Sequence, residues 1–270
     1  MAIVRVGAVS YLNARPLVVG LEAHRDRFAV RYDLPSTCAQ LLHSHEIDLG
    51  LIPSIEYLRG QGYAIVPDCA VASDGPVASV ALFTQVPIER VATLALDTSS
   101  RTSVALTRVM TAKYFDIAPR FIDEGPDLEL MVRRADAALL IGDPALFADY
   151  RRLGLDKIDL GQAWKDFTGL PFVYACWTGQ PGALTSDDVA QLQRARSVGA
   201  TTPEIVSHGY YPDDAVKAAI GADYLRENIR FRMGEREQAG LARFFALAAE
   251  VGVVPKAQPL RWYEGPALHY

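Results

Sequence analysis

Short polar side chains follow an apolar run at the start of the chain, and their types suit the binding of an anion. The run is Ile3–Val9, and Ser10, Asn13 and Arg15 come directly after it, with Pro16 next. The apolar run predicts a buried strand, and the polar cluster followed by proline is typical of a loop that leads into a helix. Hydroxyl, amide and guanidinium groups beside a helix N-terminus at a strand end favour a negatively charged ligand.

A second polar cluster occupies the corresponding place in the second half of the chain. It follows a strand predicted over 91–96 and supplies four candidates: Thr98, Ser99, Ser100 and Thr102. An offset of 88 lays Ser10 over Thr98, although the two halves share almost no identity. Such residues are also the preferred N-caps of helices, so capping alone stays open for each. Two clusters that face one cleft favour anion binding over capping.

Four more residues could reach the same cleft, two at predicted strand ends and two in extended segments that link the halves. Ser79 is expected at its floor, in an extended segment between the two halves, and Ser54 after Pro53 indicates mainly a helix cap. Asp143 is the one acid that we expect at a strand terminus of the second half, and capping or hinge contacts are favoured over ligand contact because a carboxylate repels an anion. Tyr174 is expected to line the apolar side of the pocket, with core packing as the alternative.

The elements that must position these residues form two halves of the same layout. Each half reads as strand, helix, strand, helix, strand, and extended segments at 77–87 and 170–177 are expected to cross between them. We therefore predict an α/β fold of two lobes with a ligand cleft between them and a two-stranded hinge. Residues 1–84 and 176–270, with three C-terminal helices, would form the first lobe, and 85–175 the second. One continuous doubly wound sheet is the alternative.

Composition narrows the partners. The 270 residues carry a net charge of −5 without a basic block, which argues against nucleic acid. No run of about 18 apolar residues predicts a membrane helix, and the start lacks the pattern of a secretory signal, so a cytoplasmic location is expected. The cysteines, Cys38, Cys69 and Cys176, lie far apart and are expected to be reduced, and His43 and His45 do not share a helix face, so no metal site is expected. The sequence does not indicate the oligomeric state.

Four stretches carry a resemblance to a known family. They are SYLNARPL at 10–17, IDLGLIPSIEYL at 47–58, LPFVYACW at 170–177 and the GE-xx-Q-x-GL-xx-F pattern at 234–244. In them the chain resembles the chorismate dehydratases of the futalosine route to menaquinone. The resemblance implies the fold of the type II periplasmic binding proteins, with two α/β lobes around a cleft. It implies chorismate as substrate and no cofactor.

The implied reaction removes water from chorismate to give 3-[(1-carboxyvinyl)oxy]benzoate. A proton leaves the ring carbon that bears the enolpyruvyl ether, the neighbouring hydroxyl departs and the ring becomes aromatic. On this resemblance Asn13 and Ser79 would be catalytic, and the substrate would be bound by Ser10, Arg15, Ser54, Thr98, Ser99, Ser100, Thr102, Asp143 and Tyr174. No histidine falls in these motifs. Our hypothesis is that the enolpyruvyl carboxylate, held by Asn13 and Ser79, takes the proton itself.

Two other functions stay open at this point. The first is the sister synthase of the same route, which forms dihydroxynaphthoate from a cyclic futalosine derivative. The second is a cytoplasmic solute-binding or sensor protein for a small aromatic or dicarboxylate anion, because the same lobes serve receptors as well as enzymes. Turnover of chorismate distinguishes the enzyme from the sensor.

Overall fold

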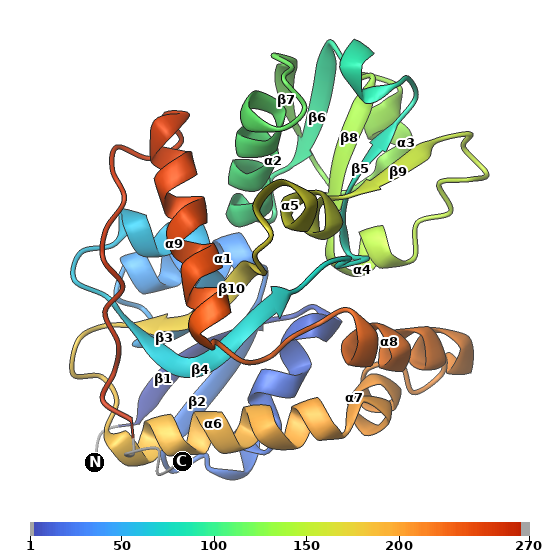
Figure 1. Ribbon diagram of the computed structural model, residues 1–270. Coiled ribbons are helices and arrows are strands. Elements are labelled where there is room, and N and C mark those ends of the chain that lie inside the picture. The colour runs from blue at the N-terminus through green and yellow to red at the C-terminus, as the bar shows by residue number, and fades with distance from the viewer. Residues whose placement is uncertain (1–2, 266–270) are drawn as a thin grey trace.

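The computed structural model describes residues 3–265, which form two α/β lobes, one above the other in Figure 1. The lower lobe contains a five-stranded sheet of order β2-β1-β3-β10-β4, and the upper lobe one of order β7-β6-β8-β5-β9. The strands are β1 (Val4–Val9), β2 (Phe28–Asp33), β3 (Leu49–Pro53), β4 (Ala64–Ser73), β5 (Val80–Thr84), β6 (Thr93–Asp97), β7 (Arg120–Glu124), β8 (Ala137–Ile141), β9 (Asp156–Asp159) and β10 (Phe172–Gly179). The predicted two-lobed class is confirmed, and the alternative of one continuous sheet is wrong.

The two sheets share one plan. Strand β1 pairs in parallel with β2 and β3, and β6 pairs in parallel with β7 and β8. Each sheet is then extended by two antiparallel strands, β10 and β4 in the first and β5 and β9 in the second. The carboxyl ends of the parallel strands carry the loops where ligands bind in such sheets.

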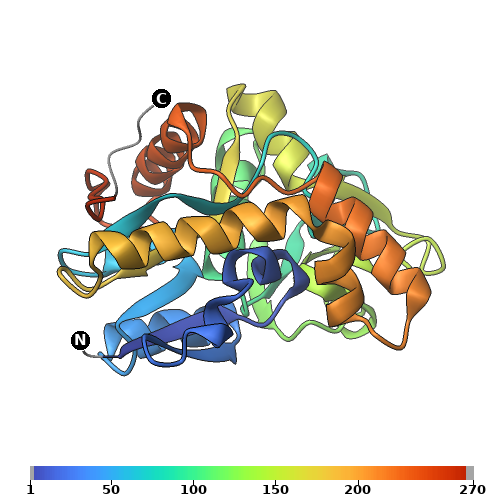
Figure 2. The ribbon, with the colours of Figure 1, turned by 90° about the horizontal axis from the view of Figure 1, so that it is seen from below.

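Helices cover the sheets and connect them. The α-helices are α1 (Pro35–His43), α2 (Arg101–Lys113), α3 (Leu128–Val132), α4 (Gly142–Leu146), α5 (Leu160–Thr168), α6 (Ser186–Thr201), α7 (Pro203–Tyr210), α8 (Ala215–Glu227) and α9 (Glu235–Glu250). Short 3₁₀ helices are η1 (Leu12–Val18), η2 (Leu21–Ala23), η3 (Ser54–Arg59) and η4 (Ile88–Arg90). Figure 2, from below, shows α6 along the underside of the first lobe, with α7 and α8 beyond its end.

Alternation along β6 shows how the second lobe is packed on both faces. Leu94 and Leu96 belong to the large core that includes α2, whereas Ala95 between them belongs to a smaller core with Leu128 and Met131 of α3. Successive strand side chains point to opposite faces, so a strand with helices on both sides is apolar throughout. This explains the continuous apolar run at 94–96.

Three local predictions need correction. The polar loop after β1 leads into a 3₁₀ helix that contains Pro16, because proline lacks the N–H and fixes φ, which breaks an α-helical ladder. Ser54 does not cap its helix: its hydroxyl donates to the carbonyl of Val173 on β10 (2.8 Å). The region after β10 holds four α-helices in the described chain rather than three, because α7 adds a helix between α6 and α8 that was not expected.

The chain crosses between the lobes at 74–79 and at 169–171. Strand β5 pairs within the second sheet and β10 within the first. We therefore propose lobe boundaries inside these two segments, a few residues before the expected ones at 84/85 and 175/176. Residues 1–2 and 266–270, which the expected first lobe also includes, lie outside the described part of the chain.

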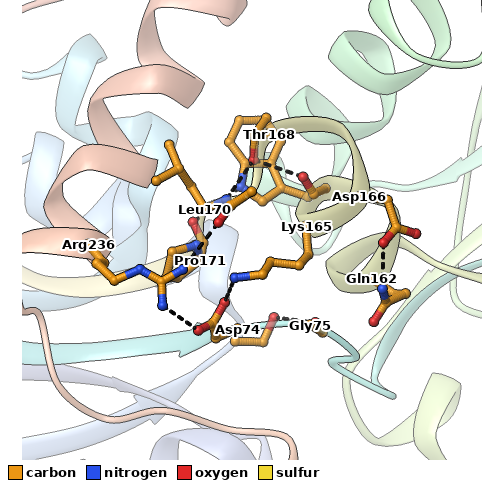
Figure 3. Close-up of polar contacts among 12 residues, drawn as sticks. Asp74, Gly75, Gln162, Lys165, Asp166, Thr168, Leu170, Pro171 and Arg236 are labelled. Carbon is orange, nitrogen blue, oxygen red and sulfur yellow. Dashed lines mark hydrogen bonds and ion pairs between the residues drawn. The ribbon is translucent and has the colours of Figure 1, made fainter.

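Ion pairs tie the first crossing segment to helices of both lobes. Figure 3 shows Asp74 between Lys165 of α5 (2.5 Å) and Arg236 of α9 (3.0 Å). A few residues on, the carboxylate of Asp159 accepts hydrogen bonds from the backbone of residues 77 and 78 (3.0 and 2.7 Å). The crossing is thus held in a defined path.

The start of α6 provides a test of acid stability. Thr185 caps this helix with a capping box, and the carboxylate of Asp188 also accepts hydrogen bonds from Arg27 (2.5 Å for Nε). Burial raises the pKa of Asp188, but the bonds from Arg27 and Thr185 outweigh it and bring the pKa to about 2. Because the folded pKa lies below the unfolded one, this stabilisation is present above about pH 4 and disappears as the pH falls towards 2.

We expect wild-type protein to lose about 2 kcal/mol more stability than Asp188→Asn between about pH 6 and about pH 2. Urea unfolding at a series of pH values measures this difference. Parallel pH curves for the two proteins would show that Asp188 does not titrate with folding.

Candidate active site

A narrow slot lies between the lobes at the carboxyl ends of the parallel strands. Its walls include Tyr11, Asn13 and Tyr174 from the first lobe and Ser100, Ser103 and Ile141 from the second. The walls enclose about 470 Å³, of which only about 40 Å³ is open to the centre of a water molecule. One water needs roughly 10–15 Å³ of such space, so the slot admits a few waters at most. The lobes must therefore part to admit a ring-sized ligand.

Asn13 reaches the slot because α6 holds the 3₁₀ helix η1 in place. Helix α6 packs so closely on η1 that a Cβ on Gly199 of α6 would lie 2.1 Å from the carbonyl oxygen of Pro16 in η1. Glycine at this point lets two backbones meet. The position of Asn13 thus depends on a residue far away in the sequence.

Asn13 and Ser79 meet at a third side chain. The hydroxyl of Tyr224, from α8, lies 2.6 Å from the Ser79 hydroxyl, and the Asn13 side chain is within hydrogen-bonding reach of it. Burial raises the pKa of Tyr224, which keeps the phenol protonated. Ser79 is itself buried, one residue before Val80 on the slot wall. The predicted catalytic pair is therefore brought together, with Tyr224 as its support.

The first turn of α2 supplies the hydroxyls of the opposite wall. Ser100 is the N-cap: its hydroxyl accepts from the backbone N–H of Ser103 (3.3 Å) and lies 3.0 Å from the Ser103 hydroxyl. Both side chains also line the slot. Ser100 therefore both caps α2 and lines the slot where a ligand would bind.

A chain of polar groups crosses from one lobe to the other at Ser99. The hydroxyls of Tyr11 and Ser99 lie 3.3 Å apart, and the Ser99 backbone donates to Asp97 (3.0 Å). Asp97 is fully buried, and burial raises its pKa. It is the last residue of β6, which corrects our expectation that Asp143 would be the one strand-terminal acid of this lobe. Gly142 (φ +65°) leaves room for the Tyr11 ring, since a Cβ there would lie 3.1 Å from it.

Three other predicted residues join the lobes without lining the slot. Ser54 and Thr102 are fully buried, with their hydroxyls 3.4 Å apart. Asp143 accepts from the backbone of Leu12 (3.3 Å) and from Tyr210 (2.6 Å), both in the first lobe. Asp143, for which capping or hinge contacts were favoured, does not cap α4 but joins the two lobes.

The remaining predicted residues lie elsewhere. The Arg15 guanidinium stacks on Tyr32 and Tyr210 (4.1 and 5.1 Å to the ring centres) in a groove of the first lobe. The backbone carbonyl of Ser10 accepts from Tyr210 (3.0 Å), and Thr98 is exposed in a separate cavity. In this closed arrangement they do not border the slot.

Sequence reasoning missed Tyr11, Ser103, Tyr224 and Asp97. Tyr11 lies two residues before Asn13, and Ser103 lies three residues after Ser100 on α2, so the spacing of slot-facing positions could have found them. Asp97 comes directly after the strand predicted over 91–96, and the structure makes it the last residue of β6. No local pattern points to Tyr224, which lies in a helix more than a hundred residues beyond Ser79.

The slot contains no side chain from residues 3–265 that could act as a general base at neutral pH. Its lining residues include no Asp, Glu, His, Lys or Arg among the described chain. Burial raises the pKa of Tyr11, and that of Tyr174 lies well above its usual value for the same reason. Both phenols therefore stay protonated and can donate hydrogen bonds rather than remove a proton.

The rest of the described chain offers no metal site, no membrane-spanning helix and no reactive thiol. Among residues 3–265 no group of three or more His, Cys, Asp and Glu side chains could hold a metal ion. Within the same residues no helix has the length and apolar character that spanning a membrane requires. Cys38, Cys69 and Cys176 are buried free thiols, and burial raises their pKa values to about 12, 12 and 11.

Two lobes joined by two crossing segments around a slot define a protein with the fold of the periplasmic binding proteins. The periplasmic aliphatic sulphonate binding protein SsuA from Escherichia coli superposes with a TM-score of 0.65 at 17% identity, covering 99% of this chain and 96% of that one. The chain belongs to the menaquinone biosynthesis family, whose model matches residues 4–250.

Two curated relatives carry one name. A chorismate dehydratase from Thermus thermophilus is 32% identical over 260 residues, which cover 88% of this chain and 93% of that protein. A chorismate dehydratase from Campylobacter jejuni is 25% identical over 245 residues, covering 88% of this chain and 94% of that one.

Proposed function

We propose that this protein is a chorismate dehydratase of menaquinone biosynthesis, a hydro-lyase that converts chorismate to 3-[(1-carboxyvinyl)oxy]benzoate and water. The observation that carries the proposal is the convergence of neutral donors from both lobes on one apolar slot. Asn13 comes from one side and Ser100 and Ser103 from the other. Family membership and the name of both curated relatives support it.

The slot suits a substrate with two carboxylates on an unsaturated ring. Leu51, Val71, Val80 and Ile141 supply apolar walls for the ring, and the polar side chains supply donors for its anionic groups. With the lobes shut, water is excluded and each hydrogen bond to the charge that develops in the reaction becomes stronger. Positioning and electrostatic stabilisation then supply most of the catalysis.

The lining favours a base that comes from the substrate. No carboxylate, imidazole or amine of the described chain lines the slot, and the two tyrosines there remain protonated. The enolpyruvyl carboxylate, held by Asn13 with Ser79 behind it, would remove the ring proton. The same proton would then pass to the departing hydroxyl, which leaves as water, and the electron pair of the broken C–H bond completes the aromatic ring. A product complex with a protein carboxylate or imidazole within hydrogen-bonding reach of the reacting carbon would contradict this step.

Incubation of the purified protein with chorismate tests the function. We expect the ultraviolet absorbance of the cyclohexadiene to disappear and a benzoate spectrum to replace it, with no added cofactor. Binding of chorismate without any spectral change would instead identify a sensor, and neither binding nor change would leave the sister synthase as the enzyme to assay.

A further inference from the structure

A second cavity between the lobes has a different character from the slot. It is lined by Ser36 and Arg59 of the first lobe, by Thr98, Arg101 and Arg108 of the second, and by residues 251–253 after α9. We call it the basic vestibule. It holds about 650 Å³ of space that water can enter, against about 40 Å³ in the slot. A ring acid would fit here while the slot is still shut.

The basic vestibule adjoins the slot along the first turn of α2. Ser100 and Ser103 face the slot, whereas the next residues, Arg101 and Val104, line the basic vestibule. At the N-terminus of α1, Pro35 lines the slot and Ser36 lines the basic vestibule. Between the two spaces the backbone N–H of Ser36 donates to the carbonyl of Ser99 (3.2 Å). Together with the Tyr11–Ser99 and Arg101–Glu56 contacts, this hydrogen bond holds the lobes together where the open cavity meets the closed one.

The charge of the basic vestibule is positive. Arg59 and Arg101 both form ion pairs with the fully buried carboxylate of Glu56, and Nη1 of Arg101 lies 2.8 Å from its Oε2. The same carboxylate also contacts Nε2 of His43 (2.9 Å). Arg108 lies over the ring of Phe121, 4.3 Å from its centre.

Three arginines and Asp123 thus line the cavity, and the buried Glu56 behind its wall pairs with only two of the arginines. The Arg59 and Arg101 side chains are 43% and 36% exposed, so their charges reach the solvent in the cavity.

Two other grooves of the described chain lack this combination. The groove around Arg15 is lined by the first lobe alone, and the groove around Arg133 by the second lobe alone. A ligand bound in either would not lie on the line along which the lobes part. Clefts lined by one sign of charge concentrate ions of the opposite sign and raise association rates.

We propose that the basic vestibule is an entry site for the dianionic substrate, where a carboxylate pairs with Arg101 and Arg108 before the Ser36–Ser99 contact opens. This inference rests on the proposed function and adds a route and a first binding site to it. The ligand class is a dicarboxylate carried on a six-membered ring.

Arg108→Gln is the test variant, because Arg108 lacks a buried ionic partner in the described chain, whereas loss of Arg59 or Arg101 would weaken the compensation of Glu56. Arg133→Gln is the matched control: its side chain is 73% exposed in the second-lobe groove. We expect Arg108→Gln to lower kcat/KM for chorismate about three- to tenfold at low salt, mainly through KM. The dependence of kcat/KM on salt between about 0.02 and about 0.5 M should flatten as well.

Equal effects of the two variants would indicate a general effect of net charge and overturn the proposal, as would a wild-type salt dependence in Arg108→Gln. Calorimetric titration with benzene-1,3-dicarboxylate supplies a readout that does not depend on turnover. If wild type does not convert chorismate, the proposed function fails. The entry site then stands only if Arg108→Gln weakens binding of this probe and Arg133→Gln does not.

Discussion

We expect Asn13→Ala to lower the turnover of chorismate by about 10²–10³-fold, the usual loss when one preorganised donor to a developing charge is removed. Asn13 lines the slot and meets Ser79 through Tyr224, so its truncation removes a donor and loosens the group that holds the enolpyruvyl carboxylate. Ser79→Ala should lower turnover in the same direction. Steady-state kinetics with chorismate measure both effects.

Gln40→Ala is the control for this prediction. It removes an exposed amide from α1, outside the slot, and should turn over chorismate as wild type does. Thermal unfolding of Asn13→Ala close to that of wild type would show that the loss is not a folding defect. Wild-type rates in both Asn13→Ala and Ser79→Ala would remove these residues from the site.

Gly199→Ala should have the largest effect on stability. The added Cβ would lie 2.1 Å from the Pro16 carbonyl oxygen, so α6 and η1 must separate. We expect the free energy of unfolding to fall by about 3 kcal/mol, the upper part of the range for overpacking, and turnover to fall because Asn13 moves with η1. Urea unfolding and chorismate kinetics measure the two effects.

Gly209→Ala is a matched control in the neighbouring helix α7. Its Cβ would meet no atom of the described chain within 4 Å, and replacing an exposed helical glycine by alanine stabilises by about 0.5–1 kcal/mol. Equal stability of the two variants would contradict the close packing of α6 on η1.

The sequence predicted the lobes well because each strand carries its own signal. The apolar run at 94–96 is readable without knowledge of the sheet, since both of its faces are covered. The polar cluster around Ser100 could also be predicted, because the start of α2, which needs an N-cap, is also the part of the helix that faces the slot.

The directions of side chains and the contacts between residues far apart in the chain could not be predicted from the sequence. The 3₁₀ geometry of η1 turns Arg15 towards Tyr32 and Tyr210 rather than into the slot, and a pattern based on α-helices does not anticipate this. Tyr224 touches Ser79 only because α8 returns to the cleft after the second crossing. Such contacts are set by tertiary packing, for which a local pattern holds no information.

The sealed thiols have a practical consequence for watching the molecule in action. The pKa values of Cys38, Cys69 and Cys176 lie far above neutrality, so almost no thiolate is present to react with a maleimide dye. Two cysteines introduced on the surface, one in each lobe, would therefore carry the fluorophores while the native three stay in place. Energy transfer between the dyes would then report each opening and closing in single molecules.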